Sequence, residues 1–307
     1  MLVNLYALFV TAALLTNITL TNITPVVRPW QQSDDRFTAK VVNLTLSEIS
    51  ETGPSAETAS FISRSIDLFW PKRQQLFKAT EPYIDPLDTS KTSAALDILY
   101  RLRAFHPMGG LGYNEQAWEK EQSGFFADLD TVVYAKLDRL LLTKDDPLLR
   151  NLALYLGVSP SPAAKGALLQ LARNPGVAEQ ALICLGWHKD QKDMDDLLPF
   201  MLQGGREAAS LPYVFRNSYG AVAVPYLRKA VAQANSPFAR LQAAFQLVHL
   251  RDITGVEYLL EAVLHRGTLP NGTAQAGEIR QFATDYMGFP KEATNMEDLV
   301  KFLKSKL

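Results

Sequence analysis

The sequence predicts an all-α fold: an α-α superhelix of stacked helix pairs, with an irregular N-terminal extension that could contain short strands. Residues 236–267 have the pattern of one helix, a short turn and a second helix. The same pattern returns upstream at intervals of about 30 residues, a spacing typical of stacked repeats. A helix pair of this size cannot bury its apolar face alone. We therefore expect each pair to stack on the next and to leave a long surface exposed.

Residues 1–24 form a hydrophobic N-terminal segment. Residues 2–15 are apolar and uncharged, which is shorter than the roughly 20 residues of a membrane span and closer to the core of a signal peptide. No Lys or Arg precedes the run, and its best small-residue cleavage site is poor. A signal sequence, a membrane anchor and a segment packed on the body therefore stay open. We expect an extracytoplasmic (secreted or periplasmic) or membrane-anchored protein, otherwise a cytoplasmic one, with residues 2–20 as the part that could reach a membrane.

Residues 25–60 are expected to be an extended, strand-like linker region. Just upstream, residues 16–24 contain a tandem Thr-Asn-Ile-Thr, rich in the β-branched residues that favour strands. Residues 37–46 alternate roughly between apolar and polar positions and predict a strand. Residues 47–60 are polar and contain a Gly-Pro pair, which predicts a linker or turn, with Ser55 as the N-cap of the next helix.

Residues 61–145 are expected to be a helical N-terminal cap or a separate helical subdomain. Apolar residues at helical spacing predict helices over 61–69, 92–105 and 129–142. Residues 107–126 are rich in Gly and aromatic residues and predict a loop between helices. Their Gly-Gly-Leu-Gly run lacks the spacing of a dinucleotide or phosphate loop, so it does not indicate a nucleotide site. A cap is expected because the first repeat of a stack otherwise exposes its apolar side.

Residues 146–267 contain the repeats, and residues 268–307 are expected to form C-terminal capping helices. The last repeat is the clearest. Ser236 is placed to cap its first helix, and Pro237 lies in the first turn, where a missing N–H costs nothing. The four predicted helix pairs cover residues 146–174, 175–203, 204–235 and 236–267.

The pattern Pro-x-x-Arg-x-x-Ala-Ala-x-x-Leu-x-x-Leu-x-Asp over residues 237–252 resembles the short HEAT-like repeats first described in phycobilisome lyases. The likeness is good for residues 237–266, fair for 147–174 and 175–203, and weak for 204–235, so it covers about 120 residues. The resemblance implies a right-handed stack of helix pairs and, most often, protein–protein interaction. It says little about function, because similar repeats occur in scaffolds, bilin lyases and DNA glycosylases.

Composition limits the function classes. Of all residues, 47% are hydrophobic, enough for a large core, and 31 basic against 32 acidic residues leave a net charge of −1. Nucleic-acid binders normally carry a basic excess, so we do not expect a nucleic-acid partner. Four asparagines lie in Asn-x-Ser/Thr sequons, which would carry glycans only in a secreted eukaryotic protein. They are Asn17, Asn22, Asn43 and Asn271.

The sequence contains no recognisable catalytic or metal-binding motif. The histidines have no metal-ligand spacing, and no nucleophile motif is present. The acidic cluster of Asp193, Asp195 and Asp196 suits a helix N-terminus. Cys184 lies in an apolar run, which is typical of a buried thiol, although a reactive thiol is the alternative. We expect no enzyme, no metal and no cofactor.

The expected function is a non-enzymatic interaction or scaffold module that binds another protein or peptide on its concave face. The resemblance implies that the second helix of each pair lines that face. The candidate contact residues are therefore Lys165, Arg173, Arg228, Lys229, Glu257, Tyr258, Glu261 and His265. A solvated charged face without a partner is the plainer interpretation of the same pattern. The alternative function is a lyase-like or small-ligand-binding protein with a pocket near Cys184, Trp187 and His188.

Overall fold

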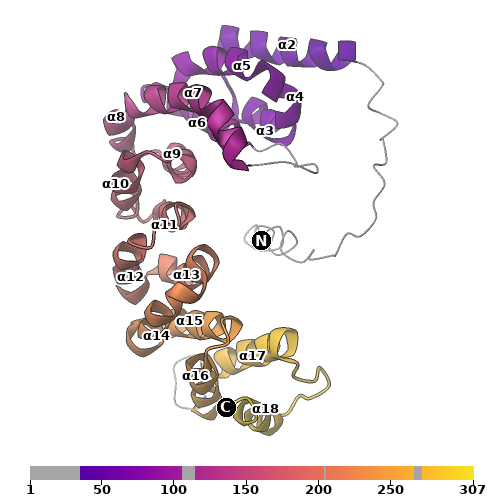
Figure 1. The fold of residues 1–307 in the computed structure, drawn as a ribbon, viewed down its shortest axis with the longest axis vertical. Helices are drawn as coiled ribbons and strands as arrows, with labels where there is room; N and C mark the ends of the chain where they lie inside the picture. The colour runs from indigo at the N-terminus through magenta and orange to yellow at the C-terminus, as the bar shows by residue number, and fades with distance from the viewer. Residues whose placement is uncertain (1–34, 106–114, 204, 266–271) are drawn as a thin grey trace. The chain divides into compact units, whose positions relative to one another are not determined.

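The computed structural model describes residues 35–105, 115–203, 205–265 and 272–307 (Figure 1). Within these ranges the protein is all-α, and no residue belongs to a strand. Packing divides the chain into two units, residues 1–44 and residues 45–307. Of the first unit, the structure describes residues 35–44, which form the first part of helix α2 (Asp35–Thr52). The rest of the described chain belongs to the second unit.

The strand predicted over residues 37–46 is wrong, because these residues belong to α2. The same helix takes in residues 47–52, so the linker predicted over residues 25–60 is helical from Asp35 to Thr52. The physical reason is spacing: Val42, Leu46 and Ile49 follow one another at intervals of four and three, which suits one face of a helix. This spacing outweighs the β-branched composition, which is a weak and context-dependent signal. The tandem Thr-Asn-Ile-Thr lies outside the described residues.

Several helices connect α2 to the predicted pairs. They are α3 (Ala56–Arg64), α4 (Ile66–Phe69), η2 (Trp70–Lys72), α5 (Arg73–Thr80), η3 (Glu81–Tyr83), α6 (Thr89–Ala104), α7 (Glu115–Tyr134) and α8 (Leu137–Leu141). The central one is α6, which packs against α3, α5 and α7 and also against α9, the first helix of the first pair. The first pair therefore has a helical neighbour on its N-terminal side.

The helix predicted over residues 92–105 is confirmed as α6, but the loop predicted over residues 107–126 is wrong from Glu115 onward. From Glu115 onward this stretch is helical, as the first half of α7. Phe125 and Phe126 are buried, at 6% and 4% exposure. These aromatic residues therefore lie on a buried face of α7 and not in a loop. Residues 106–114 lie outside the described residues.

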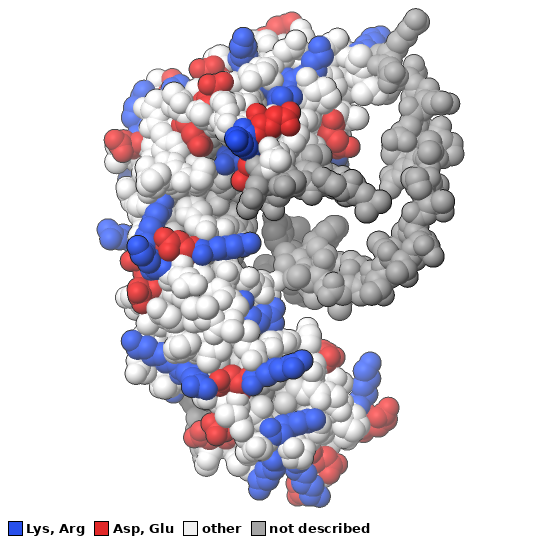
Figure 2. Space-filling view, in the orientation of Figure 1, with Lys and Arg blue, Asp and Glu red and all other residues white. Residues whose placement is uncertain are grey.

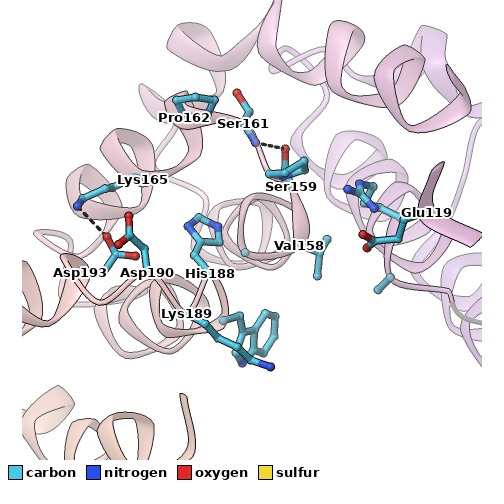
Figure 3. A pocket seen from close by; sticks show the side chains of 15 residues that line it. Glu119, Val158, Ser159, Ser161, Pro162, Lys165, His188, Lys189, Asp190 and Asp193 are labelled. Carbon is cyan, nitrogen blue, oxygen red and sulfur yellow. Dashed lines mark hydrogen bonds and ion pairs between the residues drawn. The ribbon is translucent and has the colours of Figure 1, made fainter. Parts of the chain in front are cut away.

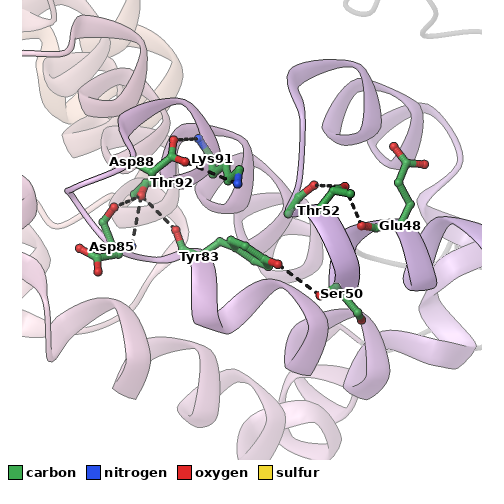
Figure 4. A network of polar contacts seen from close by, with 9 residues as sticks. Glu48, Ser50, Thr52, Tyr83, Asp85, Asp88, Lys91 and Thr92 are labelled. Atoms are coloured by element: carbon green, nitrogen blue, oxygen red, sulfur yellow. Dashed lines mark hydrogen bonds and ion pairs between the residues drawn. The ribbon is translucent and has the colours of Figure 1, made fainter.

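A tight turn joins α2 to α3 and confirms Ser55 as an N-cap. Gly53 has a φ of +87°, in the left-handed region that favours glycine, and a Cβ there would lie 2.8 Å from the ring of Tyr83. The Ser55 hydroxyl oxygen accepts a hydrogen bond from the backbone N–H of Thr58 at 3.1 Å. Beside the turn, the Tyr83 hydroxyl donates to the backbone carbonyl of Ser50 at 3.3 Å (Figure 4).

The four predicted helix pairs are confirmed as pairs of helices. They are α9 (Asp146–Val158) with α10 (Pro162–Leu171), α11 (Ala178–Trp187) with α12 (Asp193–Gln203), α13 (Leu211–Tyr219) with α14 (Val224–Gln233), and α15 (Pro237–His249) with α16 (Ile253–Leu264). Short 3₁₀ turns, η4 (Arg206–Ala209) and η5 (Gly220–Ala223), flank α13. Ser236 caps α15 as predicted, because its side chain accepts from the backbone N–H of Ala239.

Successive pairs pack first helix on first helix and second helix on second helix (Figure 1). Helix α9 contacts α11, α11 contacts α13 and α13 contacts α15. Among the second helices, α12 contacts α14 and α14 contacts α16, while α10 is joined to α12 by the ion pairs of Lys165. Two glycines permit close approach in the first series. A Cβ on Gly157 would lie 2.7 Å from Cys184 Cβ, and one on Gly186 would overlap Val214 Cγ1. The backbones of α9 and α11, and those of α11 and α13, therefore approach each other closely.

The last pair packs against two further helices. They are α17 (Gly272–Phe282), continued by a π-helical turn η6 (Ala283–Met287), and α18 (Met296–Lys304). Both α17 and α18 contact α16. The rings of Phe245 in α15 and Phe282 in α17 stack with centroids 4.2 Å apart, and Leu299 and Leu303 of α18 are fully buried. Residues 272–307 thus continue the core of the last pair.

Candidate functional site

The predicted contact residues all belong to second helices or directly follow them. They are Lys165 in α10 and Arg173 after it, Arg228 and Lys229 in α14, Glu257, Tyr258 and Glu261 in α16, and His265 at the C-cap of that helix. Lys165 and Tyr258 are half-buried, and the others are exposed. The structure brings these residues onto one series of helices, but it gives them different roles.

Lys165 of α10 forms ion pairs with two carboxylates of α12. Its ammonium group lies 2.7 Å from Asp193 Oδ1 and 2.7 Å from Asp196 Oδ2, both in the first turn of α12. Hydrogen bonds to these carboxylates raise the pKa of Lys165 above its ordinary value. The Asp193 side chain is only 1% exposed, so Lys165 compensates a buried charge. The predicted place of the acidic cluster at a helix N-terminus is confirmed.

Two further contacts connect successive second helices. The Tyr226 hydroxyl in α14 donates to Asp195 Oδ1 at 2.9 Å. The Arg228 guanidinium binds the Asp252 carboxylate through two hydrogen bonds, of 3.2 and 2.6 Å, and Asp252 is the N-cap of α16. We call these contacts the second-helix ladder: Lys165–Asp193/Asp196, Asp195–Tyr226 and Arg228–Asp252.

The ladder leaves a smaller set of candidates for binding a partner. Lys229, Glu257 and Glu261 are exposed and form no salt bridge with any residue that the structure describes. Tyr258 is half-buried, and this burial raises the pKa of its hydroxyl. On the face shown in Figure 2, Lys and Arg side chains are interspersed with Asp and Glu. Such a surface suits a polar partner that carries both signs of charge.

Cys184 is a buried thiol. It is 0% exposed, and burial raises its pKa to about 12, so the reactive thiolate is scarce at neutral pH. A cavity lies beside Trp187 and His188, but Cys184 is not among the residues that line it. The reason is the close approach of Gly157, which packs α9 directly over the Cys184 side chain.

This cavity has a volume of about 900 Å³ and lies where α6 and α7 meet the segments after α9 and α11 (Figure 3). Cavities of this size accept small molecules. His188 points along one wall, with its Nε2 atom 3.0 Å from the backbone oxygen of Leu156. Since a carbonyl oxygen can only accept, Nε2 carries the proton and donates. Six charged residues also line the cavity: Arg103, Glu119, Lys165, Lys189, Asp190 and Asp193.

A polar network adjoins the cavity between α7 and α9. Asp130 Oδ1 accepts hydrogen bonds from the Tyr155 hydroxyl at 2.7 Å and from the Ser159 hydroxyl at 3.0 Å. The Tyr134 hydroxyl donates to Ser159 Oγ at 3.0 Å. Burial, followed by the charge of Asp130, raises the pKa of Tyr155 well above its ordinary value, so this fully buried tyrosine is a neutral donor. The network fixes the wall of the cavity around Ser159.

Arg103 is a cavity residue that the repeat pattern does not reveal. It is 7% exposed, and its guanidinium carbon lies 4.1 Å from the centroid of the Phe126 ring. The signal in the sequence is its spacing, because Arg103 follows Leu96 and Leu99 by seven and four residues and so lies on the apolar stripe of α6. A charged residue on such a stripe is rarely buried without a partner, which makes it a pointer to function.

Other predicted features lie largely outside the described residues. Residues 2–20 and the sequons at Asn17, Asn22 and Asn271 lie outside the described residues. Asn43 is exposed in α2. None of the helices that the structure describes is both long and apolar enough to cross a bilayer. Among the described side chains, no group of three or more His, Cys, Asp or Glu is arranged to hold a metal ion.

No known family model, no curated protein and no solved structure matches this chain. The described part of the chain is all-helical, and its helices from α9 to α16 form pairs that pack in chain order.

Proposed function

We propose that the protein is a non-enzymatic interaction or scaffold module, built from HEAT-like helix pairs stacked as a solenoid, which binds another protein or a peptide. The observation that carries the proposal is the order of packing from α9 to α16, first helix on first and second on second. In this order each pair buries its apolar face on its neighbours, as in a repeat stack. Repeat stacks expose long surfaces, which suit extended partners.

The binding surface in this proposal is the exposed side of the second helices. The resemblance implies that this face is concave, but Figure 1 draws α10, α12 and α14 on the outer side of the curve and α9, α11 and α13 on its inner side. Lys229, Glu257 and Glu261 are its core, because they are exposed and stand outside the second-helix ladder. Arg173 extends the surface beyond α10. Lys165 and Arg228 contribute indirectly, since their carboxylate partners on the next helix already occupy them.

Affinity capture with charge-reversed variants tests this proposal. Lys229→Glu combined with Glu261→Lys, made in the full chain, is compared with the wild type for the proteins each captures from the native source. We expect a stoichiometric partner of the wild type to be lost while the thermal midpoint stays unchanged, because exposed substitutions of this kind cost little stability. The matched control reverses Glu292 and Lys301, which are exposed at the C-terminal end.

Two outcomes would count against the proposal. If the first variant keeps every partner of the wild type, the proposed surface is wrong. If the wild type captures no stoichiometric partner under conditions that solubilise membranes, the proposed function itself is wrong.

We also propose that residues 2–20 take the protein out of the cytoplasm, as a signal sequence or an anchor. The support is their apolar, uncharged composition. Fractionation of the native source, with the mass of the N-terminal peptide, tests this. A shortened N-terminus indicates a signal sequence, and an intact one in the membrane fraction indicates an anchor. An intact N-terminus in the soluble cytoplasm would contradict both.

A further inference from the structure

Arg103 is a buried cation without an anionic partner among the residues that the structure describes. It is 7% exposed, its Nε atom has no hydrogen-bond partner, and it forms no salt bridge there. Asp130 of the adjacent network gives its Oδ1 atom to Tyr155 and Ser159 instead. Taking a guanidinium out of water is costly unless an anion pairs with it. The position therefore suits a bound anion.

The surroundings of Arg103 leave room for that anion. Besides the cavity of about 900 Å³, Arg103 lines a second one of about 440 Å³, and the two also share Glu119 and Pro160. Arg103 therefore lies where the two cavities adjoin. The Phe126 ring, 4.1 Å from the guanidinium carbon, covers part of the group. The donors of a guanidinium lie in its plane, so stacking on an aromatic ring leaves them available to an acceptor.

We propose that Arg103 anchors a small organic anion, a carboxylate or phosphate on a flat apolar body, in the larger cavity. Guanidinium groups bind carboxylate and phosphate oxygens through two parallel hydrogen bonds, which gives both strength and orientation. The apolar body would lie along Ala104, Val158 and Trp187 of the cavity wall. Trp187 is 39% exposed at the end of α11 and offers an aromatic surface for it.

The other charged residues that line the cavity carry one net negative charge, which lies among exposed residues, whereas the charge of Arg103 is buried. Lys165 is already paired with Asp193 and Asp196. Of the remaining charged residues, which Figure 3 labels, Lys189 is basic and Glu119 and Asp190 are acidic. All three are exposed. Water screens exposed charges far more than a buried one, so the field of Arg103 dominates. Glu119 still repels an anion, and we expect its carboxylate to weaken binding. This inference is independent of the proposed interaction function.

Binding of a fluorescent organic anion to the full chain tests the inference. The probe is 8-anilino-1-naphthalenesulfonate, whose sulfonate stands in for a carboxylate or phosphate, and N-phenyl-1-naphthylamine is its uncharged counterpart. Fluorescence titration of both probes is made with the wild type and with Arg103→Met. We expect the anion to bind the variant about 10- to 100-fold more weakly, because a charged hydrogen-bonded pair is lost. The uncharged probe should bind both proteins with similar, low affinity.

Three variants make the result specific to Arg103. Arg101→Met is the matched control, because Arg101 is on the same helix but pairs with Asp97 outside the cavity, and it should bind the anion like the wild type. Glu119→Gln should bind it more tightly. Arg103→Lys keeps the charge but not the planar pair of donors, and should bind about tenfold more weakly. If Arg103→Met does not fold, the loss of anion binding is measured on Arg103→Lys instead.

Stability separates a ligand anchor from a structural cation. Without probe, Arg103→Met should melt at the same temperature as the wild type or higher, since an unpaired buried charge is replaced by an apolar chain of similar length. A clearly lower midpoint, with unchanged probe affinity of Arg103→Lys, would show that Arg103 serves the fold. Equal binding of the anion to all variants, or no binding to the wild type, would also overturn the proposal.

Competition identifies the headgroup. Benzoate, phenyl phosphate and phenol share a flat body and differ in charge, and each is added to the complex of the wild type with the sulfonate probe. Displacement by benzoate or by phenyl phosphate, but not by phenol, is the expected result and tells a carboxylate site from a phosphate site. Displacement by phenol as efficient as by either anion would show an apolar cavity without an anion anchor.

Discussion

Two glycines in neighbouring helices should respond in opposite directions to the same substitution. Gly166 lies in α10, where a new Cβ would meet no atom within 4 Å. Gly186 lies in α11, where the Cβ would come closer than 3.0 Å to Val214 Cγ1 and to 3.3 Å from Ser218 Oγ. We expect Gly166→Ala to stabilise the protein and Gly186→Ala to destabilise it.

The magnitudes follow from two terms. Ala is more favourable than Gly inside a helix by about 0.5–1 kcal/mol, and Gly166→Ala should raise the free energy of unfolding by that amount. Gly186→Ala gains the same helix term but forces a methyl group into a packed crossing, which costs about 1–3 kcal/mol. Val214 is 5% exposed, so its methyl group has no solvent to turn into. The gain from replacing Gly by Ala in a helix is the same for both variants. The difference between their free energies of unfolding, about 1–3 kcal/mol, therefore measures overpacking alone.

Urea unfolding of the full chain, followed by far-UV circular dichroism, measures both free energies. Val214→Ala, introduced into the wild type and into Gly186→Ala, completes a double-mutant cycle. The substitution should cost less in the second background, because it removes the atom that the new Cβ meets. If Gly186→Ala proves as stabilising as Gly166→Ala, α11 and α13 do not approach closely at this point, and the account of how the pairs pack is wrong.

Three further predictions concern single side chains. Cys184 should resist a thiol reagent at neutral pH in the folded protein and react fully in urea, because burial raises its pKa to about 12; rapid reaction of the native chain would contradict this. Burial, and then Arg216, lower the pKa of His249 to about 4, so between pH 6.5 and 4 the unfolded chain binds the proton first and stability falls with falling pH. His249→Gln should reduce the dependence of the urea midpoint on pH between about pH 6.5 and 4. An unchanged dependence would show that His249 does not cause it. Asp252→Ala should lower the free energy of unfolding by about 1 kcal/mol or more, since α16 loses its N-cap and Arg228 loses its carboxylate partner. Asp252→Asn keeps the cap, loses only the charge pair and should cost less; equal losses would contradict the capping role.

The helix pairs are the part of the fold that local sequence patterns predict best. Pro147, Pro162, Pro212, Pro225 and Pro237 each lie in the first turn of a helix, where proline both fits and fixes the backbone. Apolar residues at intervals of three and four then follow. These are short-range signals, so one sequence is enough to read them. The wrong strand prediction over residues 37–46 also came from short-range signals. A half-apolar, β-branched stretch of ten residues fits both the two-residue period of a strand and the roughly 3.6-residue period of a helix.

Roles that depend on distant residues could not be predicted. Lys165 looks like a solvent-facing residue of α10, but its partners Asp193 and Asp196 follow it by 28 and 31 residues. Whether they meet depends on how one helix pair is rotated on the next, which no local pattern specifies. Arg103 is different, since its place on the apolar stripe of α6 is visible in the sequence. Its lack of a partner is visible only in the structure.

The second-helix ladder makes the pairs unequal parts rather than interchangeable copies. Each contact of the ladder has a different chemistry: the first is a lysine between two carboxylates, the second a tyrosine hydroxyl on a carboxylate, and the third an arginine on a carboxylate. Helix α14, the next second helix after α12, contains no acidic residue. A chain that lost α11 and α12 would bring α14 beside Lys165 and give that lysine no carboxylate to bind. Loss of a whole helix pair would thus leave this protein with mismatched neighbours.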